Sequence, residues 1–405
     1  MSRNNAAGAL AGVKVIDLSR VLGGPFCTQM LADHGADVIK VEPPQGDETR
    51  GWGPPFQDGT ASYFIGINRN KRGIALDLSR EAGRAVLFRL LADADVMIEN
   101  FKTGTLEKWG MGYAAVLKER FPRLIHCRIS GYGADGPMGG YAGYDAAVQA
   151  SSGIMSLNGE KDGGPRRVGI PVVDLATGFN ATVGILMALV ERQHSGQGQF
   201  IETTLQDSGL MLMHPYATNW FMSGKAPQRT GNAHPNLCPY DQFRTRTKPI
   251  FLGVGNDRQF QRFCAEIERP ELARDPRFAT NADRVANRAA LRAAIEDVLA
   301  AFDGDDLCMR LLERGVPCGV VQEVPDVLTH PHTRHRNMIC EMDEYRGVFN
   351  AIKMSRTPAS LRRKPPRFGA ANREVLQAAG YSAAEIDALI ADGIVFDTMR
   401  KAPAD

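Results

Sequence analysis

Short apolar segments alternate with longer helical patterns through the first half of the chain. The apolar segments are rich in β-branched residues and read VKVIDLS, ADVIKVEPP, GIALDL, DVMIEN and LIHCRIS. Helical patterns such as GGPFCTQMLADHG lie between them. Strands that alternate with helices are typical of a parallel sheet covered by crossover helices, so the pattern predicts a doubly wound α/β fold.

Polar residues stand where these predicted strands end. The ends read Ser19-Arg20, Glu42-Pro43, Asp77-Leu78, Asn100-Phe101 and Ser130-Gly131-Tyr132. In doubly wound sheets, ligands bind beyond the carboxyl ends of the strands. We therefore expect a binding site at this edge of the sheet.

One acidic residue stands at the start of the longest apolar helix pattern. Apolar residues recur at helical spacing from Leu175 to about Gln193, and Asp174 precedes them in the segment GIPVVDLATG. If the helix begins just after Asp174, its carboxylate is an N-cap that accepts hydrogen bonds from unpaired backbone N–H groups. The same carboxylate in an apolar pocket can attack an activated acyl group. The spacing alone leaves both interpretations open.

The order of predicted elements changes after this helix pattern. A loop, TGNAHPNLCPY, a strand, IFLGVG, and several helices predict a smaller α+β unit over residues 224–325. We expect a large domain over 1–215 and a C-terminal segment, 329–405, that returns to it. In the run GVGNDRQF, Arg258 stands where a dinucleotide fingerprint needs its third glycine, so no dinucleotide site is predicted there.

The composition is that of an ordinary globular protein. Of the 405 residues, 43% are hydrophobic and 23% are charged, and the net charge is +2. Lys and Arg are scattered among nearly equal numbers of acids, whereas nucleic-acid binders concentrate basic residues on one face. We therefore expect small anionic ligands and no nucleic-acid partner.

The cysteines and histidines predict neither a disulfide framework nor a metal site. The seven cysteines form no CxxC pair, and the N-terminus lacks the apolar core of a signal peptide, so we expect a cytoplasmic protein. In THPHTRH, the histidines His330, His332 and His335 have no cysteine or acid at ligand spacing. No run approaches the roughly 20 apolar residues that span a bilayer, so no membrane partner is expected.

Many segments, in the same order, make the chain resemble the class III CoA-transferases, which include formyl-CoA transferase and carnitine CoA-transferase. The matching segments are LSRVLGGPFCTQMLADHGADVIKVE, GDETRGWGPPF, NRNKRGIALDL, ENFKTGTLEKWG, ISGYGADGP, AGYDAAVQASSGIMS and DLATG before the long helix. They cover the first half of the chain, and the likeness continues more weakly to the C-terminus. The resemblance implies a Rossmann-like large domain and a smaller α+β domain in a homodimer of interlocked, ring-shaped chains.

The resemblance assigns covalent catalysis to Asp174. It implies that the carboxylate attacks the thioester of an acyl-CoA, giving an anhydride and then an aspartyl-CoA thioester, from which CoA passes to a free carboxylic acid. Coenzyme A and its thioesters are then substrates, and no prosthetic group is expected.

Two alternatives accompany this assignment. An α-methylacyl-CoA racemase shares the fold and the aspartate, but this chain has Tyr144 where the racemase has a histidine. A phenol with a pKa of about 10 is a poor second base. The other alternative is a CoA-binding protein without catalytic activity.

By the same resemblance, CoA lies along the strand ends. The residues implied to contact it are Leu76, Asp77, Asn100, Phe101, Lys108 and Tyr144, with Arg20 and Arg50 for the phosphates. Two family positions differ, because Leu22 stands in place of a Gln and Pro43 in place of an Arg. Some nucleotide contacts must therefore differ from those of formyl-CoA transferase.

A loop in the second unit bears on the acid substrate. The segment Gly231-Asn232-Ala233-His234 corresponds in position to a glycine-run loop of formyl-CoA transferase, but the glycine run is missing. It looks more like the loop of relatives that act on succinate and glutarate, which disfavours formyl or oxalyl transfer. We expect Gly231 and Asn232 to shape this loop and His234 to meet the distal carboxylate of such an acid.

Overall fold

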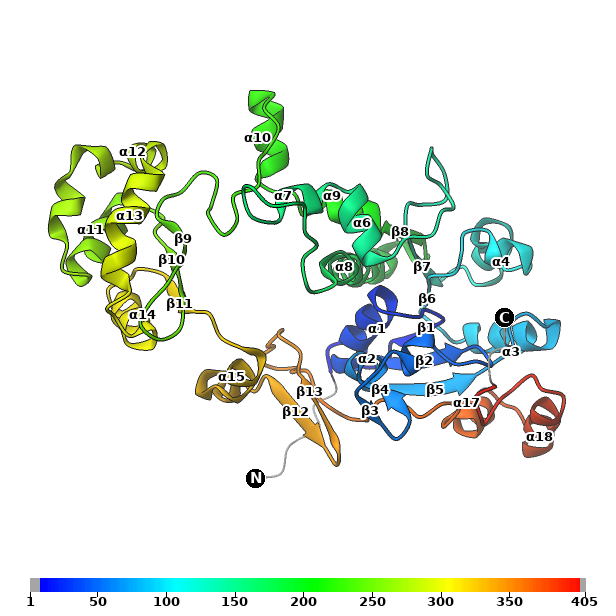
Figure 1. The fold of residues 1–405 in the computed structure, drawn as a ribbon. Helices are drawn as coiled ribbons and strands as arrows, with labels where there is room; N and C mark the ends of the chain where they lie inside the picture. The colour runs from blue at the N-terminus through cyan, green and yellow to red at the C-terminus, as the bar shows by residue number, and fades with distance from the viewer. Residues whose placement is uncertain (1–7, 401–405) are drawn as a thin grey trace. The chain divides into compact units, whose positions relative to one another are not determined.

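The computed structural model describes residues 8–400 (Figure 1). Contacts within the chain divide them into two units. Unit 1 contains the chain up to Ile154, Arg167–Pro215 and the chain from Arg336 onward, and unit 2 contains Met155–Arg166 and Tyr216–His335. Each unit has its own buried core.

The limits of these units differ from the expected domain limits at three points, one of which is that the second stretch of unit 2 begins at Tyr216 and not at residue 224. Residues 155–166 group with unit 2, because the N–H of Gly231 donates a hydrogen bond to the carbonyl of Gly159 over 3.0 Å. The chain returns to unit 1 at Arg336 and not at residue 329.

Six parallel strands form the sheet of unit 1. In chain order they are β1 (Lys14–Asp17), β2 (Asp37–Glu42), β5 (Lys71–Ala75), β6 (Val96–Glu99), β7 (Ile125–Ser130) and β8 (Phe200–Thr204). Their spatial order is β5-β2-β1-β6-β7-β8, and all neighbours are parallel. In this register Ile16 of β1 lies between Ile39 of β2 and Met97 of β6. The order reverses between β1 and β6, the point at which doubly wound sheets bind ligands.

Helices cover both faces of this sheet. The helices of unit 1 are α1 (Gly23–Asp33), α2 (Ser62–Gly66), α3 (Glu81–Leu91), α4 (Thr105–Lys108), α5 (Lys118–Arg120), α6 (Asp145–Ser151), α8 (Val172–Ser195), α9 (Leu205–Met211), α17 (Asn372–Ala378) and α18 (Ala383–Ala391). α1 and α8 share one core with Val15 of β1, whereas α3, α17 and α18 share the other core with Ile16. Successive strand residues therefore enter opposite cores, as expected of a strand buried on both faces.

Short elements complete unit 1. They are the hairpins β3 (Phe56–Gln57) with β4 (Thr60–Ala61) and β12 (Ile339–Met342) with β13 (Tyr345–Val348), and the single-turn helices η1 (Glu48–Gly51) and η2 (Tyr113–Leu117). α7 (Ile154–Leu157) lies where the chain passes into unit 2.

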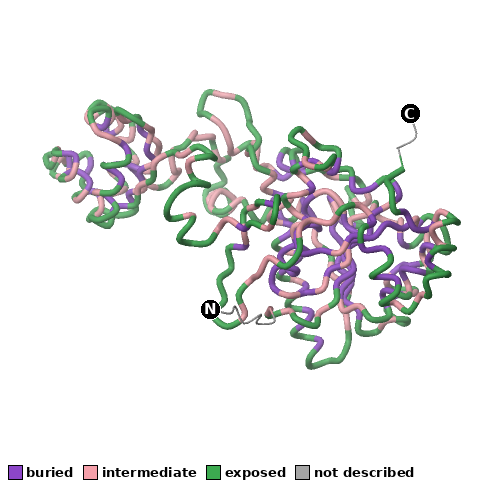
Figure 2. Tube along the Cα trace, turned by 90° about the horizontal axis from the view of Figure 1, so that it is seen from below, coloured by how far each residue is buried: buried purple, intermediate pink, exposed green. Residues whose placement is uncertain are grey.

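Unit 2 contains an antiparallel three-stranded sheet in the order β11-β10-β9. Its strands and helices are β9 (Tyr240–Phe243), β10 (Ile250–Gly253), β11 (Cys318–Val320), α10 (Tyr216–Ser223), α11 (Asp257–Glu266), α12 (Asn281–Ala286), α13 (Arg288–Leu299), α14 (Gly304–Glu313), α15 (Val324–Thr329), α16 (Pro331–His335), η3 (Pro270–Arg274) and η4 (Pro276–Phe278). In the run GVGNDRQF, the side chain of Asn256 accepts a hydrogen bond from the N–H of Gln259 and caps α11. The run therefore starts a helix that contributes Phe260, Phe263 and Cys264 to the core of unit 2. Figure 2 colours the buried residues of the chain purple.

Among the described residues, one helix is long and apolar enough to cross a membrane by length and composition alone, contrary to the expectation from the sequence. This helix is α8, and 44% of its most apolar window is buried inside the protein. Ala181, Ile185 and Leu189 on its inner side belong to the core beneath the sheet. One face of α8 is therefore packed in the core of its own unit, whereas the other face exposes apolar side chains such as Met187 and Val190.

Candidate active site

A cavity of about 340 Å³ opens beyond the carboxyl ends of β1, β6 and β7. All of its lining residues belong to unit 1. The lining comprises residues 20–23 after β1, 100–103 after β6, 129–131 at the end of β7, 140–144 before α6, Glu48, Asp174 and Leu205. The cavity lies at the reversal of strand order, where the fold predicts ligand binding.

Asp174 is in the first turn of α8 and is not its cap. The helix begins at Val172, before Asp174, and the residue that precedes the helix makes no side-chain cap. Instead the carboxylate of Asp145, at the start of α6, accepts hydrogen bonds from the N–H groups of Val173 (2.8 Å) and Asp174 (3.1 Å). Because a neighbouring helix supplies the cap, the N-cap interpretation of Asp174 was wrong.

The surroundings of Asp174 make its carboxyl group less acidic. Burial raises the pKa of Asp174 to about 7, and the negative charge of Asp145 adds to the effect. The amino end of α8 favours the ionised form, but burial outweighs this contribution. A carboxylate with a raised pKa is more basic and more nucleophilic than an exposed one.

Two glycines let the start of α1 pass close to α8. A Cβ atom at Gly178 would stand 2.7 Å from the carbonyl oxygen of Gly23, and one at Gly23 would stand 3.3 Å from the carbonyl oxygen of Asp174. Larger residues would therefore push the helices apart. This close approach places the loop after β1 in the same cavity wall as Asp174.

Arg20 and Asn100 join the ends of β1 and β6 at the cavity. The side chain of Asn100 accepts a hydrogen bond from the N–H of Arg20 (2.9 Å) and donates one to its carbonyl oxygen (2.7 Å). The guanidinium group of Arg20 lies 3.4 Å from the carboxylate of Glu48. Phe101 and Tyr144 also line the cavity, so the structure brings these four predicted residues together with Asp174.

Arg50 is not available for a phosphate, which corrects the expectation for this residue. Its guanidinium group donates to both carboxylate oxygens of Glu42, over 2.8 and 2.7 Å, and lies over the ring of Phe64. The side chain is only 4% exposed. Its charge is therefore already neutralised by a buried bidentate pair.

Three other predicted CoA contacts do not line the cavity. The side chain of Leu76 is buried in the core. The carboxylate of Asp77 accepts hydrogen bonds from the backbone and hydroxyl of Ser79. Lys108 is exposed on α4, and the cation of that segment that lines the cavity is Lys102.

Sequence reasoning missed Asp145, Glu48 and Lys102. Asp145 follows Tyr144 directly and starts a helical pattern, a common place for an aspartate, but its hydrogen-bond partners stand 28 and 29 residues further along the chain. Nothing in the local sequence indicates that long-range contact.

The predicted substrate loop lies in unit 2. Gly231 has a φ of 61°, which favours glycine, and Asn232 donates a hydrogen bond to Gln242. Nδ1 of His234 accepts a hydrogen bond from the N–H of Asn236 over 3.0 Å. Burial lowers the pKa of His234, and the charge of Arg288 contributes, which favours the neutral ring. Because Nδ1 accepts a hydrogen bond, the neutral ring carries its proton on Nε2 and can donate there.

A second cavity of unit 1, of about 420 Å³, lies at the amino end of β5. Its cations are paired with acids: Arg72 binds Asp37 over 2.6 Å, and Arg367 binds Asp58 over 2.8 Å. This cavity therefore offers a phosphate less free positive charge than its composition indicates.

The lining of the first cavity offers few groups for covalent chemistry. Among its described residues there is no Cys or His, and the hydroxyl of Ser130 accepts a hydrogen bond from the N–H of Gly133. Across residues 8–400, no three His, Cys, Asp or Glu side chains are grouped so as to hold a metal ion. The arrangement is suited to nucleophilic attack by the Asp174 carboxylate.

Comparison with known proteins identifies the family. A family model described as CoA-transferase family III matches residues 10–372. The chain belongs to CoA-transferase family III. A succinate–glutarate CoA-transferase of Agrobacterium fabrum is 40% identical over 91% of this chain and 94% of its own length. An acetyl-CoA:oxalate CoA-transferase of Acetobacter aceti is 40% identical over 86% of this chain and 90% of its own length.

A solved structure agrees with this assignment. The crystal structure of a CAIB/BAIF family protein from Brucella suis has a TM-score of 0.84 and 41% sequence identity, and the match covers 92% of this chain and 100% of that one. The resemblance to CoA-transferases and the mixed α/β fold with a large parallel sheet are confirmed. The protein is a family III CoA-transferase, and it uses CoA thioesters as substrates.

Proposed function

We propose that the protein transfers CoA from an acyl-CoA to a free dicarboxylic acid of the succinate or glutarate type through covalent intermediates on Asp174. The observation that carries this proposal is the half-buried Asp174 carboxylate in the cavity at the switch point of the sheet, with its helix capped by another residue. Because Asp174 does not cap the helix, its carboxylate is free to react with a thioester.

The first half-reaction loads CoA onto the protein. The carboxylate oxygen of Asp174 attacks the thioester carbonyl of the donor, the carbon–sulfur bond breaks, and a mixed anhydride and CoA thiolate form. The thiolate then attacks the aspartyl carbonyl of the anhydride, which releases the donor acid as a carboxylate. The product is an aspartyl-CoA thioester.

The second half-reaction repeats these steps with the acceptor. Its carboxylate attacks the aspartyl thioester, giving a second anhydride and CoA thiolate, and the thiolate attacks the acceptor carbonyl. The new acyl-CoA leaves, and the Asp174 carboxylate is regenerated. No net proton transfer is needed, which is consistent with a lining that lacks a histidine among its described residues.

Within this mechanism, Arg20 and Lys102 are the cations placed to meet CoA phosphates, and Asn100, Phe101 and Tyr144 form walls for the rest of the cofactor. His234, with its Nε2 proton, is the proposed partner of the distal acid carboxylate. The names of the relatives support a dicarboxylate, and they include both glutarate and oxalate.

Trapping of the intermediate tests this function. The protein is mixed with succinyl-CoA, treated with hydroxylamine and mapped by mass spectrometry. We expect a label confined to the peptide of Asp174 and absent from the Asp174→Ala variant. Glutarate and oxalate are then compared as acceptors of the loaded protein.

The outcomes separate the alternatives. If CoA is transferred to oxalate in preference to glutarate, the proposed acceptor of the succinate or glutarate type is wrong, and the acceptor is a shorter dicarboxylate. CoA exchange without any adduct would refute covalent catalysis by Asp174. Exchange of the α-proton of a 2-methylacyl-CoA with solvent, without transfer of CoA to a free acid, would favour a racemase. Binding of CoA without any reaction would favour a non-catalytic protein.

We also propose that the protein is a homodimer, with unit 1 as the Rossmann-like large domain of the interlocked arrangement implied by the family. The outer face of α8 exposes large apolar side chains, Phe179, Val183, Met187 and Val190. In unit 2, α10 exposes Trp220, Phe221 and Met222, the last at 84%. Contiguous apolar surfaces of this kind are typical of interfaces, and a second copy of the chain is the proposed partner.

A further inference from the structure

The loop between β1 and α1 contains an unusual backbone conformation. Among the described residues, six non-glycine residues have positive φ angles, and Val21, at 68°, is the one with a β-branched side chain. Branched residues avoid this region because the side chain crowds the backbone. Val21 lines the cavity with Asp174, so the strained residue is part of the candidate active site.

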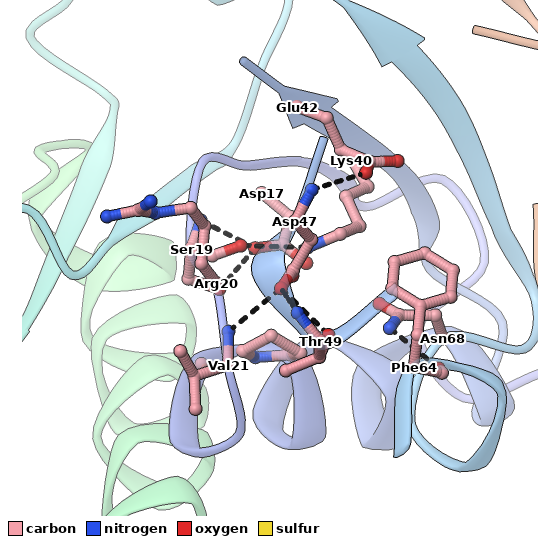
Figure 3. Close-up of polar contacts among 12 residues, drawn as sticks. Asp17, Ser19, Arg20, Val21, Lys40, Glu42, Asp47, Thr49, Phe64 and Asn68 are labelled. Carbon is pink, nitrogen blue, oxygen red and sulfur yellow. Dashed lines mark hydrogen bonds and ion pairs between the residues drawn. The ribbon is translucent and has the colours of Figure 1, made fainter. Parts of the chain in front are cut away.

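A buried ion pair lies against this loop. Nζ of Lys40 donates to the carbonyl oxygen of Ser19 (2.8 Å) and to the carboxylate of Asp47 (2.9 Å). The other carboxylate oxygen of Asp47 accepts from the N–H of Val21 at 3.5 Å. Figure 3 shows the Asp47 carboxylate in contact with both the lysine and the loop. The pair therefore contacts the loop on both sides of Arg20.

The pair is itself fixed by its neighbours. Asp47 accepts hydrogen bonds from the N–H (3.1 Å) and hydroxyl (2.8 Å) of Thr49, and its own N–H donates to Glu42 (2.9 Å). Glu42 is in turn held by the bidentate contact with Arg50. Both side chains of the pair are fully buried.

Both members of the pair are charged at neutral pH. Burial by itself would raise the pKa of Asp47, but Lys40 and the bonds from Thr49 hold it below its usual value. Burial would lower the pKa of Lys40, but Asp47 and Asp17 hold it above its usual value. A buried pair of this kind seldom stabilises a fold more than apolar residues would, so a role in fixing one local conformation is the better explanation.

We propose that Lys40 and Asp47 are positioning residues for the reaction at Asp174. They hold the backbone of residues 19–21 in the strained conformation that forms the cavity wall, and thereby set the place of the thioester relative to the Asp174 carboxylate. Small displacements of a reacting group lower the rate of the chemical step more than they weaken substrate binding. This proposal rests on the proposed function of Asp174.

The test compares two variants with wild type. The first is Asp47→Asn alone, and the second combines Asp47→Asn with Lys40→Met, so that neither position keeps a buried charge without its partner. We expect kcat for CoA transfer to fall on the order of tenfold to a hundredfold, with KM for the acyl-CoA changed less than about threefold. Hydrogen exchange at the amides of residues 19–22 is expected to accelerate in both variants without any substrate.

The matched control is Arg69→Met. Arg69 forms a similarly buried pair with Asp33, over 2.6 Å, but does not line the cavity. We expect this variant to lose thermal stability while its kcat, per folded molecule, stays within about twofold of wild type. Addition of Val21→Gly to Asp47→Asn is expected to restore part of kcat, because glycine adopts the required φ without strain.

Three results would overturn the proposal: unchanged kcat and exchange in Asp47→Asn, an equal loss of kcat in the Arg69→Met control, or a loss confined to KM. Failure of the proposed function gives a different result, because wild-type protein would then form no aspartyl adduct with any acyl-CoA. The exchange measurement still reports in that case whether the pair holds the loop.

Discussion

Two aspartates have different roles at the start of α8. Asp145 accepts the hydrogen bonds that cap the helix, and Asp174 faces the cavity with a pKa raised to about 7. The pairing has an electrostatic consequence, because the charge on the capping residue adds to the raised pKa of its neighbour. The raised pKa of Asp174 is therefore caused by burial first and by Asp145 second.

Replacing Asp145 with Asn is expected to move the pH midpoint of aspartyl adduct formation below about 7. Asn retains an oxygen that accepts from the N–H of Val173 but has no charge, so the like-charge repulsion disappears while burial remains. The midpoint is expected to stay above the ordinary value of 3.8. Single-turnover rates between about pH 5 and pH 9 measure it. An unchanged midpoint would contradict this role of Asp145.

Asp174 is expected to lower the stability of the protein as pH rises. Folding raises its pKa from 3.8 to about 7, so the folded state keeps a proton that the unfolded state releases between these values. The stabilising contribution is complete below pH 3.8 and is lost as pH rises through about 7.

The Asp174→Asn variant avoids this loss. Above pH 7 its free energy of unfolding is expected to exceed that of wild type by at most about 4 kcal/mol, and near pH 4 the two are expected to agree closely. Urea unfolding at the two pH values provides the measurement, and a difference independent of pH would contradict the raised pKa.

At the scale of elements, local patterns located the strands well and the helix starts less well. Each of the five apolar segments predicted as strands contains or overlaps a strand of the sheet, whereas α8 begins before Asp174. A strand is specified by its own apolar run, but the start of a helix depends on which groups accept hydrogen bonds from the N–H groups of its first turn. For α8 that partner lies on α6.

Oxidation is expected to link α14 to β11 in unit 2. Sγ of Cys308 lies 2.7 Å from Sγ of Cys318, and a disulfide needs about 2.05 Å. With oxidised glutathione, the two thiols lose two protons and two electrons, the glutathione disulfide is reduced, and the protein mass falls by about 2 Da. Peptide mapping without reductant checks the link.

Two controls define this redox test. Cys264, buried in the same core, is expected to stay reduced, and Cys308→Ser is expected to prevent the link. A glutathione adduct on Cys318 with no cross-link in wild type would show that the two sulfur atoms do not approach closely enough.

At the scale of the whole molecule, the C-terminal segment and the apolar surfaces matter most. α17 and α18 complete the core on one face of the unit 1 sheet, so the last part of the chain is needed for the large sheet to be covered. The apolar faces of α8 and α10 have no cover within their own units. The first feature concerns the folding of one chain, and the second concerns its proposed assembly into a dimer.

Met187→Glu on α8 is expected to weaken the proposed dimer. The side chain is 67% exposed, so a charge there costs little in an isolated chain but opposes burial against a second copy. Light scattering coupled to size-exclusion chromatography is expected to show a dimer for wild type and a smaller or aggregated species for the variant. Met309→Glu, at a residue 58% exposed on α14, serves as the control and is expected to remain dimeric. A monomeric wild-type protein would contradict the proposed assembly.

The sequence by itself determined the fold class and the family, and it indicated Asp174 as the candidate nucleophile. Alternating apolar runs specify strands and helices locally, and the order of the matching segments, with Asp174 among them, identifies a CoA-transferase. Only the tertiary structure decided which charges are free. Arg50, predicted for a phosphate, is neutralised by Glu42, and Asp145, unnoticed in the sequence, caps α8. Charge and hydrogen-bond capacity depend on partners that the fold brings from distant parts of the chain, and spacing along the sequence does not reveal such partners.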